Sequence, residues 1–385
     1  MLLARKNKMS EFKIITEIEE KDLKEKKVLL RLDLNIPFTE DGKVANDYRI
    51  QKSLDTVNFL KENKAKIIIL AHIGREKTDS LKKVSDYLQD QDLIPNTFVP
   101  DIYNEEAEGV VNKMNSGDVI IFENLRQHDG EKEGTEEFID HLSSFGDIYV
   151  NEAFSVAHRN HSSITGIPKK LPAYAGIRLS QEVEELSKAF NPPDPFLLIV
   201  GGAKFETKLP LVKKFTSIAN MVFLGGALSN DIYRYQGFAT DSSITSDTHL
   251  DQIEELFETG KILVPADVIL YTKEVKLPSR VNSSEMIMDA GPQAVEVLGK
   301  LINSAKLIVW NGPLGFYEKG FTDSTNATLE NLIKSDAEVI IGGGDLQVAI
   351  SNFDLPDRIF VSTGGGAMLD FLSNGILIGI EALKG

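Results

Sequence analysis

The chain of 385 residues contains no cysteine. This absence excludes a disulfide framework and any thiolate chemistry. No apolar run approaches the roughly 20 residues that cross a bilayer, and Met1–Ser10 has no apolar stretch long enough for a secretory signal peptide. We therefore expect a cytoplasmic protein without a membrane partner.

Positive charge is also scarce, because 42 lysines and arginines face 58 aspartates and glutamates, for a net charge of −16. A surface of this sign repels nucleic acid and anionic membranes. If the ligands are phosphates, cations must be gathered locally. A basic residue at a strand end is therefore more informative here than it would be in a basic protein.

Two common nucleotide-binding fingerprints are missing. Gly201–Lys208 reads GGAKFETK, which does not match the P-loop pattern GxxxxGK[ST], and no GxGxxG follows the first strand of either half. The histidines show no HxH or HExxH spacing. His72, His158 and His161 could be metal ligands, but we interpret them as neutral hydrogen-bonding partners of an anion or a buried carboxylate.

The pattern that is present alternates apolar runs with amphipathic stretches, which is typical of βαβ units and a parallel sheet. The length favours two domains of about 150–200 residues. The first half contains predicted strands at Lys27–Asn35, Ile67–Leu70, Val119–Phe122 and Ile148–Val150, and a predicted helix at Tyr48–Glu62.

Basic and polar residues follow these strands, at the edge where open parallel sheets bind ligands. Arg49 opens the first helix, and with it the set includes four of the ten arginines; its other members are Asp33, Asn35, His72, Arg75, Arg126, His158, Arg159 and His161. Each arginine alone could be a surface residue or part of a helix-cap ion pair. Together they indicate an oxyanion pocket, because guanidinium groups bind phosphate and carboxylate bidentately. Arg31, in mid-strand, is predicted to be a structural ion-pair residue.

The second half is rich in glycine. A helix at Arg178–Phe190 and the breaker NPPDP at Asn191–Pro195 precede it. Glycine-bearing turns then follow predicted strands at Phe196–Val200, Met221–Leu224, Leu307–Trp310, Val339–Ile341 and Phe360–Val361. Several such turns in one sheet present backbone N–H groups that suit a nucleotide and its phosphates.

Ala337–Ile350 is the most informative of these segments. Gly342–Gly344 allow close approach of a ligand to the backbone. Asp345 is a predicted helix N-cap, with the helix starting over Leu346–Ile350. Lys204, Lys208 and Asp345 together suit a nucleotide that carries a divalent cation.

These residues resemble the phosphoglycerate kinase family over nearly the whole chain. The motifs occur in the family's order, which makes accidental similarity improbable. They are RLDLNIP (Arg31–Pro37), DYRI (Asp47–Ile50), HIGR (His72–Arg75), ENLR (Glu123–Arg126), VNEAFSVAHRNHSS (Val150–Ser163), VGGAKFETK (Val200–Lys208), VWNGPLGFYE (Val309–Glu318), IGGGD (Ile341–Asp345) and STGGGA (Ser362–Ala367).

The resemblance implies two Rossmann-like three-layer (αβα) domains with parallel sheets, joined by a hinge helix. The implied divisions are a loose extension at 1–10, a phosphoglycerate-binding domain at 11–177, a connecting helix and linker at 178–195, a nucleotide-binding domain at 196–367, and a segment at 368–385 that packs back on the first domain.

The implied reaction is reversible phosphoryl transfer from 1,3-bisphosphoglycerate to Mg-ADP, which gives 3-phosphoglycerate and ATP in glycolysis and gluconeogenesis. The resemblance also implies domain closure around the two ligands and a monomer. One alternative is a relative that binds both ligands with weak or no turnover. Another, a nicotinamide-dependent dehydrogenase, lacks the dinucleotide fingerprint.

Residue by residue, the resemblance assigns phosphoglycerate binding to Asp33, Asn35, Arg49, His72, Gly74, Arg75, Arg126 and Arg159. It assigns nucleotide binding to Gly202, Lys204, Lys208, Gly226, Gly291, Asn311, Glu318, Gly342, Gly343, Gly344, Asp345 and Leu346. Asp345 would hold Mg²⁺, and Thr363, Gly364, Gly365 and Gly366 would supply hinge or phosphate-binding amides. Arg49 and Lys204 are our catalytic candidates, since they can neutralise the transferring phosphoryl group.

The chain also departs from the family pattern. Leu346 replaces the usual Thr or Ser after GGGD, and Gln293 with Ala294 replaces Lys-Thr. Glu76, Gln127, Ser155 and Gln181 replace Pro, Phe, Gly and Lys, respectively. We expect these departures to affect nucleotide affinity and closure rate more than the chemistry.

Overall fold

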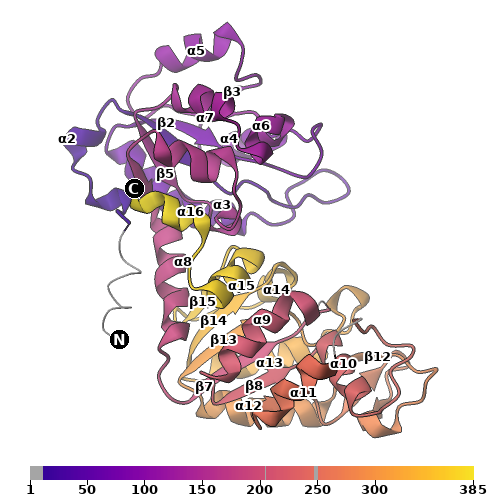
Figure 1. Ribbon diagram of the computed structural model, residues 1–385. Helices are drawn as coiled ribbons and strands as arrows, with labels where there is room; N and C mark the ends of the chain where they lie inside the picture. The colour runs from indigo at the N-terminus through magenta and orange to yellow at the C-terminus, as the bar shows by residue number, and fades with distance from the viewer. Residues whose placement is uncertain (1–11, 204, 247–249) are drawn as a thin grey trace. The chain divides into compact units, whose positions relative to one another are not determined.

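The computed structural model describes residues 12–203, 205–246 and 250–385, so the predicted extension at 1–10 lies outside the described residues. Contacts divide the chain into two compact units (Figure 1). Unit 1 comprises the residues up to Glu184 together with Ile376–Gly385, and unit 2 comprises Glu185–Gly375. The domain bounds given above, with a connection at 178–195 and a returning segment from 368, remain a prediction.

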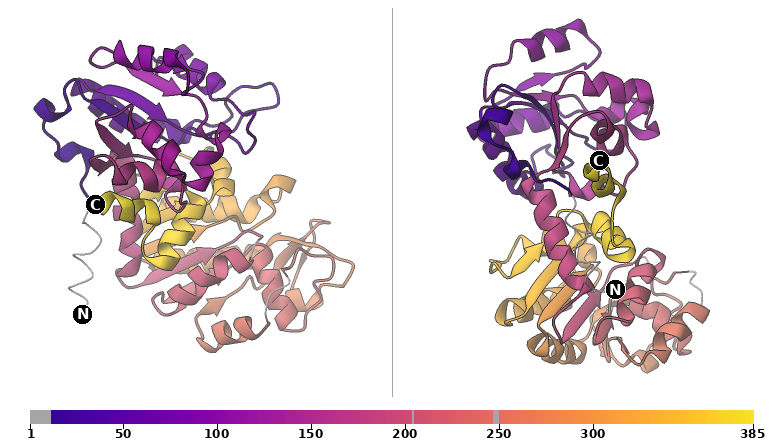
Figure 2. Two further views of the ribbon diagram at one scale, coloured as in Figure 1. Left: turned by 45° about the horizontal axis from the view of Figure 1, so that its top comes forward. Right: turned by 60° about the vertical axis from the view of Figure 1, so that its left-hand side comes forward.

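Unit 1 is built on a six-stranded sheet in the order β3-β4-β2-β1-β5-β6. All of its strand pairs are parallel. The strands are β1 (Lys27–Arg31), β2 (Lys66–Leu70), β3 (Thr97–Val99), β4 (Val119–Phe122), β5 (Ile148–Asn151) and β6 (Ala173–Ala175). They read as continuous apolar runs because helices cover both faces of the sheet (Figure 2).

The helices of unit 1 follow from amphipathic spacing. In α3 (Tyr48–Glu62), for example, Ile50, Val57 and Leu60 form the buried stripe. The others are α2 (Glu20–Leu23), α4 (Lys82–Asp90), α5 (Glu105–Asn112), α6 (Asp129–Glu133), α7 (Glu136–Ser143) and α16 (Ile378–Glu381). Helix α8 (Ile177–Ser187) continues from unit 1 into unit 2.

Unit 2 repeats the design with a six-stranded sheet in the order β15-β14-β13-β7-β8-β9. Its strand pairs are again all parallel. The strands are β7 (Phe196–Val200), β8 (Met221–Leu224), β9 (Ile262–Leu263), β13 (Leu307–Asn311), β14 (Glu338–Gly342) and β15 (Ile359–Val361).

A second sheet in unit 2 was not predicted from the sequence. It is antiparallel, in the order β11-β10-β12, and consists of β10 (Val268–Leu270), β11 (Val275–Lys276) and β12 (Ile287–Ala290). The helices of unit 2 are α9 (Phe205–Thr216), α10 (Ala227–Tyr235), α11 (Leu250–Glu258), α12 (Pro292–Ser304), α13 (Asp323–Lys334), α14 (Gly344–Ile350) and α15 (Gly365–Asn374).

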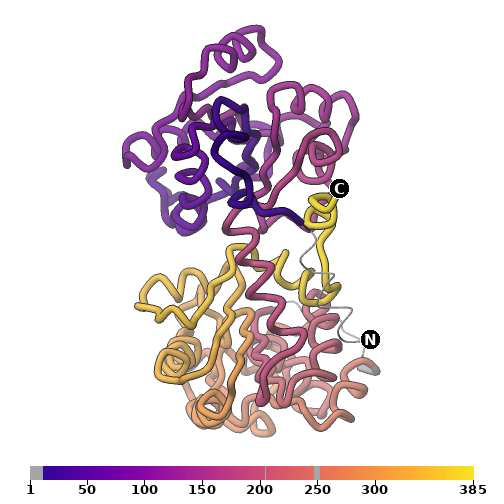
Figure 3. The backbone as a smooth tube through the Cα atoms, turned by 90° about the vertical axis from the view of Figure 1, so that its left-hand side faces the viewer, coloured from indigo at the N-terminus to yellow at the C-terminus, as the bar shows by residue number. Residues whose placement is uncertain are grey.

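The C-terminal segment, yellow in Figure 3, returns to unit 1. There the backbone N–H of Gly379 donates to Ala157 O at 2.8 Å. A Cβ atom on Gly379 would lie 2.7 Å from Ile164 Cγ2, so only glycine fits this approach. Within the described residues no single helix is long and apolar enough to cross a membrane; the bent pair Gly365–Asn374 and Ile378–Lys384 meets the length and composition test only when combined.

Candidate functional site

The carboxyl end of β1 begins the first cluster. Arg49 Nη1 lies 3.3 Å from Asp33 Oδ2 and donates to the backbone oxygen of Asn35 at 3.0 Å. The Asp33 side chain is 5% exposed and that of Arg49 is 22% exposed. Within the described residues the guanidinium is anchored through Nη1, which leaves its remaining N–H groups for a ligand.

Asp33 has a further partner, which the sequence did not indicate. Ser155 Oγ donates to Asp33 Oδ2, so this departure from the family pattern contacts a predicted substrate residue. Asn35 in turn accepts a hydrogen bond from Gly74 N at 3.0 Å. Gly74 has a φ of +62°, and a Cβ there would lie 1.8 Å from Asp79 Oδ2, which explains the glycine.

Arg126, which follows β4, is a buried positive charge in this cluster. Arg126 is buried, its Nη1 donates to Gly74 O, and its Nε has no hydrogen-bond partner within the described chain. Burial, together with the charges of Arg159 and Arg31, lowers the pKa of Arg126 to about 10. This electrostatic strain would be relieved by a bound anion.

The histidines of this cluster are neutral. Burial, followed by the charge of Arg31, holds the pKa of His72 far below its ordinary value. Burial and the charge of Arg159 lower the pKa of His161 to about 4. Arg75, by contrast, has an exposed side chain, and only its backbone N–H is fixed, by Asp79 Oδ2 at 2.8 Å.

Arg31 differs in part from its prediction. It is the last residue of β1 and is fully buried, and it makes hydrogen bonds but no salt bridge in the described structure. Its partners are Leu32 O at 2.5 Å, Ser163 Oγ at 2.9 Å and His72 Nδ1 at 3.0 Å. Arg31 therefore has the predicted structural role, but its direct partners in the described residues are hydrogen-bond acceptors and not a carboxylate.

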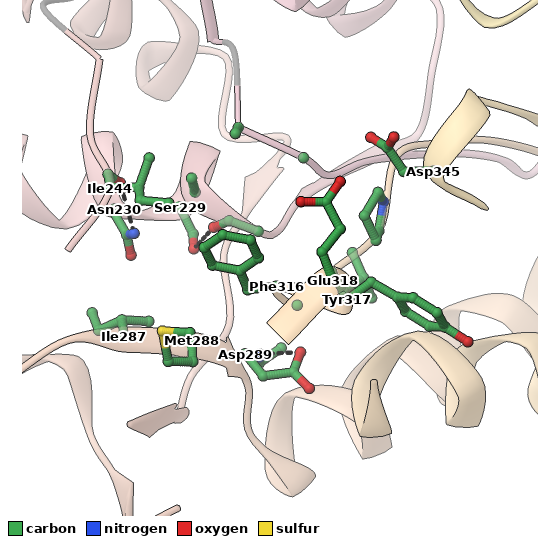
Figure 4. Close-up of a pocket in the computed structure, with 18 residues that line it drawn as sticks. Ser229, Asn230, Ile244, Ile287, Met288, Asp289, Phe316, Tyr317, Glu318 and Asp345 are labelled. Carbon is green, nitrogen blue, oxygen red and sulfur yellow. Dashed lines mark hydrogen bonds between the residues drawn. The ribbon is translucent and has the colours of Figure 1, made fainter. Parts of the chain in front are cut away.

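Unit 2 contains a pocket beside the ends of its strands (Figure 4). Of the predicted nucleotide residues, Gly202, Gly226, Glu318 and Asp345 line it. Figure 4 shows the carboxylates of Glu318 and Asp345 on one side, and Ser229, Asn230 and Ile244 on the other. Apolar side chains that sequence analysis did not single out complete the wall: Ile287, Met288, Leu314 and Phe316. Such a mixed lining suits a planar base with a polar attachment.

Lys208 and Asn311 lie next to this pocket and connect β7 with β13. Lys208 Nζ donates to Gly201 O at 2.5 Å and to Asn311 Oδ1 at 2.9 Å. Burial lowers the pKa of Lys208 to about 8. Asn311 Nδ2 is buried and has no partner within the described residues. Lys204, the other predicted lysine, lies outside the described residues.

The glycine turns of unit 2 converge. A Cβ on Gly365 would lie 2.8 Å from Gly343 Cα, and one on Gly343 would lie 3.3 Å from Gly312 N. The turns after β13, β14 and β15 therefore approach one another, which brings Gly342–Gly344 close to Thr363–Gly366. Bulkier residues would separate these backbones.

One prediction in this region needs correction. Helix α14 begins at Gly344 with Gly343 as its N-cap residue, so the predicted N-cap Asp345 lies within the first turn. The reason is the φ of +121° at Gly343, which a residue with a side chain rarely adopts. Leu346 is fully buried, and its predicted contact with the nucleotide stays a prediction.

Gly291 has a structural explanation. A Cβ there would lie 2.3 Å from Asp267 Cγ. Asp267 accepts hydrogen bonds from the first turn of α12, from Ala294 N at 2.8 Å and from Gln293 N at 3.1 Å. Gly291 thus makes room for a capping carboxylate, and it is not among the residues that line the pocket.

Comparison with known proteins identifies the family. The family model described as phosphoglycerate kinase matches residues 18–375. The phosphoglycerate kinase of Pseudothermotoga lettingae is 35% identical over 95% of this chain and 98% of its own length. That of Wolbachia pipientis wMel is 37% identical over 96% and 98%, respectively.

Comparison with solved structures supports the same family assignment. Phosphoglycerate kinase from Coxiella burnetii superposes with a TM-score of 0.82 at 33% identity, and the match covers 97% of this chain and 98% of that one. The enzyme from Pyrococcus horikoshii OT3 gives a TM-score of 0.86 at 28% identity over 96% and 98%. On the family match, the identities and the two parallel α/β sheets, this chain belongs to the phosphoglycerate kinase family.

Proposed function

We propose that unit 1 binds phosphoglycerate and unit 2 binds the nucleotide in the reaction of this family. As a family member the chain is a phosphotransferase of glycolysis that moves a phosphoryl group reversibly from 1,3-bisphosphoglycerate to ADP. The observation that carries the proposal is the group of cations Arg31, Arg126 and Arg159 that act on the buried His72. Burial, followed by the charges of Arg159 and Arg31, lowers the pKa of Arg126, as expected for a site built to receive an anion.

In this proposal the substrate phosphate and carboxylate bind to Arg49, Arg75, Arg126 and Arg159. The neutral imidazole of His72 donates a hydrogen bond to the substrate. Asp33 accepts from a substrate hydroxyl, since its carboxylate is held in place by Arg49 and Ser155. Asn35 and Gly74 fix the turn between these groups through their shared hydrogen bond.

On the nucleotide side, Gly202 and Gly226 allow the base to approach the backbone, and the carboxylate of Glu318 accepts from the ribose. Lys208, Asn311 and Lys204 contact the phosphates, with the amides of Gly342–Gly344 and Thr363–Gly366. The convergence of these turns and the unpartnered Nδ2 of Asn311 support this assignment.

The residues present fit Mg²⁺ bound together with the nucleotide. No group of three or more Asp, Glu, His or Cys in the described chain could hold a metal ion alone. Magnesium commonly binds through one or two carboxylates plus substrate phosphates, and the exposed Asp345 at the pocket edge provides one carboxylate. When bound, the ion neutralises phosphate charge.

Transfer needs little covalent help from the protein. The acceptor of the reverse reaction is a carboxylate that is already ionised at neutral pH, so no general base is required. Arg49 and Lys204 neutralise the transferring group. We further propose a cytoplasmic monomer whose two units close on their ligands, with α8 as the connecting helix, because closure excludes water from the transfer.

The test is a coupled assay with 3-phosphoglycerate, MgATP and glyceraldehyde-3-phosphate dehydrogenase that follows NADH oxidation. Arg49→Ala and Lys204→Ala should each lower kcat by about 10²–10³-fold, the usual cost of losing a preorganised charge. The exposed Arg280→Ala and Lys300→Ala are matched controls and should retain wild-type rates. A wild type that binds both ligands without turnover would instead support the non-catalytic alternative.

A further inference from the structure

A buried row of polar groups connects α6 to His72 in unit 1. Glu131 Oε1 accepts from Ser163 Oγ at 2.6 Å, and Glu131 Oε2 accepts from Ser163 N at 3.0 Å. Ser163 Oγ accepts in turn from Arg31 Nε at 2.9 Å. Arg31 Nη2 then reaches His72 Nδ1 at 3.0 Å. Glu131, Ser163 and Arg31 are fully buried, and His72 is 3% exposed.

With Glu131 ionised, the chemistry of these groups fixes the direction of every hydrogen bond. A guanidinium has only donors, so His72 Nδ1 must be the acceptor. The proton of a neutral His72 is therefore on Nε2, and no described group accepts from that atom. Ser163 Oγ has one proton, which it gives to Glu131, so it must accept from Arg31.

Electrostatics keeps His72 neutral and Arg31 in place. The groups that act on His72 are the cations Arg31, Arg126 and Arg159, together with His161, and burial disfavours a further charge. Burial raises the pKa of Glu131, whereas the charge of Arg31 and the hydrogen bonds from Ser163 lower it and favour the carboxylate that accepts at both oxygens. His161 Nδ1 lies 3.7 Å from Glu131 Oε1, too far for a proton-sharing bond.

We propose that Arg31, held by Ser163 and Glu131, is a positioning residue that locks His72 in the Nε2–H tautomer as a hydrogen-bond donor to phosphoglycerate. This inference rests on the proposed role of His72 in substrate binding. A donor that is oriented before the substrate arrives loses less entropy on binding and loses no free energy to a change of tautomer.

The tautomer can be measured without substrate. Two-bond ¹H–¹⁵N correlation spectra of the full-length protein, with the signals assigned through a His72→Ala variant, distinguish the Nε2–H form from the Nδ1–H form. In the wild type His72 should be in the Nε2–H form alone. A mixture of the two tautomers, or Nδ1–H, would overturn the proposal.

Ser163→Ala tests the relay, and Ser162→Ala is its matched control. Both serines are fully buried neighbours, but Ser162 Oγ donates to Gly130 O at 2.6 Å and takes no part in the row. Ser163→Ala should raise KM for 3-phosphoglycerate about threefold to tenfold, the usual range for one hydrogen bond, with a smaller change in kcat. It should also give His72 a detectable Nδ1–H population.

The two variants separate a positioning role from general loss of stability. Ser162→Ala should leave KM and the tautomer unchanged even where it lowers the melting temperature. Equal effects of the two variants on KM would overturn the proposal. If Ser163→Ala folds poorly, Arg31→Lys, which retains the charge but loses the forked donors, should show the same KM and tautomer changes.

His72→Ala distinguishes failure of this inference from failure of the proposed function. If that variant leaves KM for 3-phosphoglycerate unchanged, His72 does not bind substrate and the proposed role falls, whatever the tautomer. If KM rises while Arg31→Lys leaves the Nε2–H tautomer intact, the substrate role stands and the positioning role of Arg31 falls.

Discussion

The backbone N–H of Arg178, in the first turn of α8, donates to Glu152 Oε1 at 2.9 Å. The other oxygen of this carboxylate accepts from Leu179 N at 3.2 Å, and Thr56 Oγ1 donates to Oε1 at 2.6 Å. Thr56 also accepts from Ile177 N at 2.9 Å. A buried carboxyl group at the N-terminus of α8 thus joins the end of β5, the middle of α3 and the connecting helix.

Glu152 should make stability depend on pH. Burial raises its pKa to about 7 from an ordinary value of 4.5. Because the folded state binds this proton more tightly than the unfolded chain, the stabilising contribution is complete below about pH 4.5 and is lost as the pH rises through about 7. The unfolding free energy of wild type minus that of Glu152→Gln should therefore decrease from pH 5 to 7.5, by at most about 1.4 kcal/mol per pH unit.

Urea denaturation at several pH values measures this difference, and the exposed Glu184→Gln on the same helix is the control. Glu184→Gln should follow the wild-type pH profile. A wild-type minus Glu152→Gln difference that stays constant from pH 5 to 7.5 would show that Glu152 does not titrate there.

Lys208 should make kcat/KM for MgATP depend on pH. Because burial lowers its pKa to about 8, the free enzyme loses the ammonium charge as the pH rises through that value. We expect kcat/KM for MgATP, which reports the free enzyme, to fall above about pH 8. Lys208→Met should lower kcat/KM by about 10²–10³-fold and abolish this slope. As a control, Lys213→Met on the same helix should change neither kcat/KM nor its pH dependence. If kcat/KM of Lys208→Met still falls above about pH 8, another group is responsible for the titration.

Much of the fold could be predicted from the sequence because the buried parallel strands are continuous apolar runs. The predicted bounds of β4, β7, β8 and α3 match the structure. The short edge strands β3 and β6 and the antiparallel sheet β11-β10-β12 were missed, since strands of two to four residues carry little periodicity. Asp345 was misplaced because a glycine with positive φ, and not an acidic side chain, begins α14.

The site was predictable only in part. Charged residues after strands, such as Arg49 and Arg126, were found because the carboxyl edge of a parallel sheet is set by its topology. The buried hydrogen-bonded row behind His72 was not predicted. Its members Arg31 and Ser163 are 132 residues apart in the chain, and nothing local to Glu131 marks it as buried. Pairings of this kind depend on tertiary packing, which a single sequence does not reveal.

Ser155 should strengthen substrate binding through Asp33. Its hydroxyl donates to Asp33 Oδ2, and hydrogen bonds to charged groups are the stronger ones. We expect Ser155→Ala to raise KM for 3-phosphoglycerate about threefold to tenfold with little change in kcat. Ser155→Thr, which retains the hydroxyl, should restore KM in steady-state assays. An unchanged KM in Ser155→Ala would show that Arg49 alone is sufficient to orient Asp33.

Leu346 allows the strongest test of how far a family pattern can be carried over. Restoring the family's hydroxyl with Leu346→Thr would strengthen nucleotide binding if the side chain faced the phosphates. In this structure the side chain is fully buried, so the variant should instead leave KM for MgATP unchanged and lower the free energy of unfolding by about 2–5 kcal/mol, as for a buried leucine truncated to alanine. Leu346→Met, which keeps the volume, should cost less than about 1.5 kcal/mol. Denaturation and steady-state kinetics on both variants decide the matter, because a severalfold lower KM in Leu346→Thr would place position 346 at the phosphates and make the leucine a functional departure.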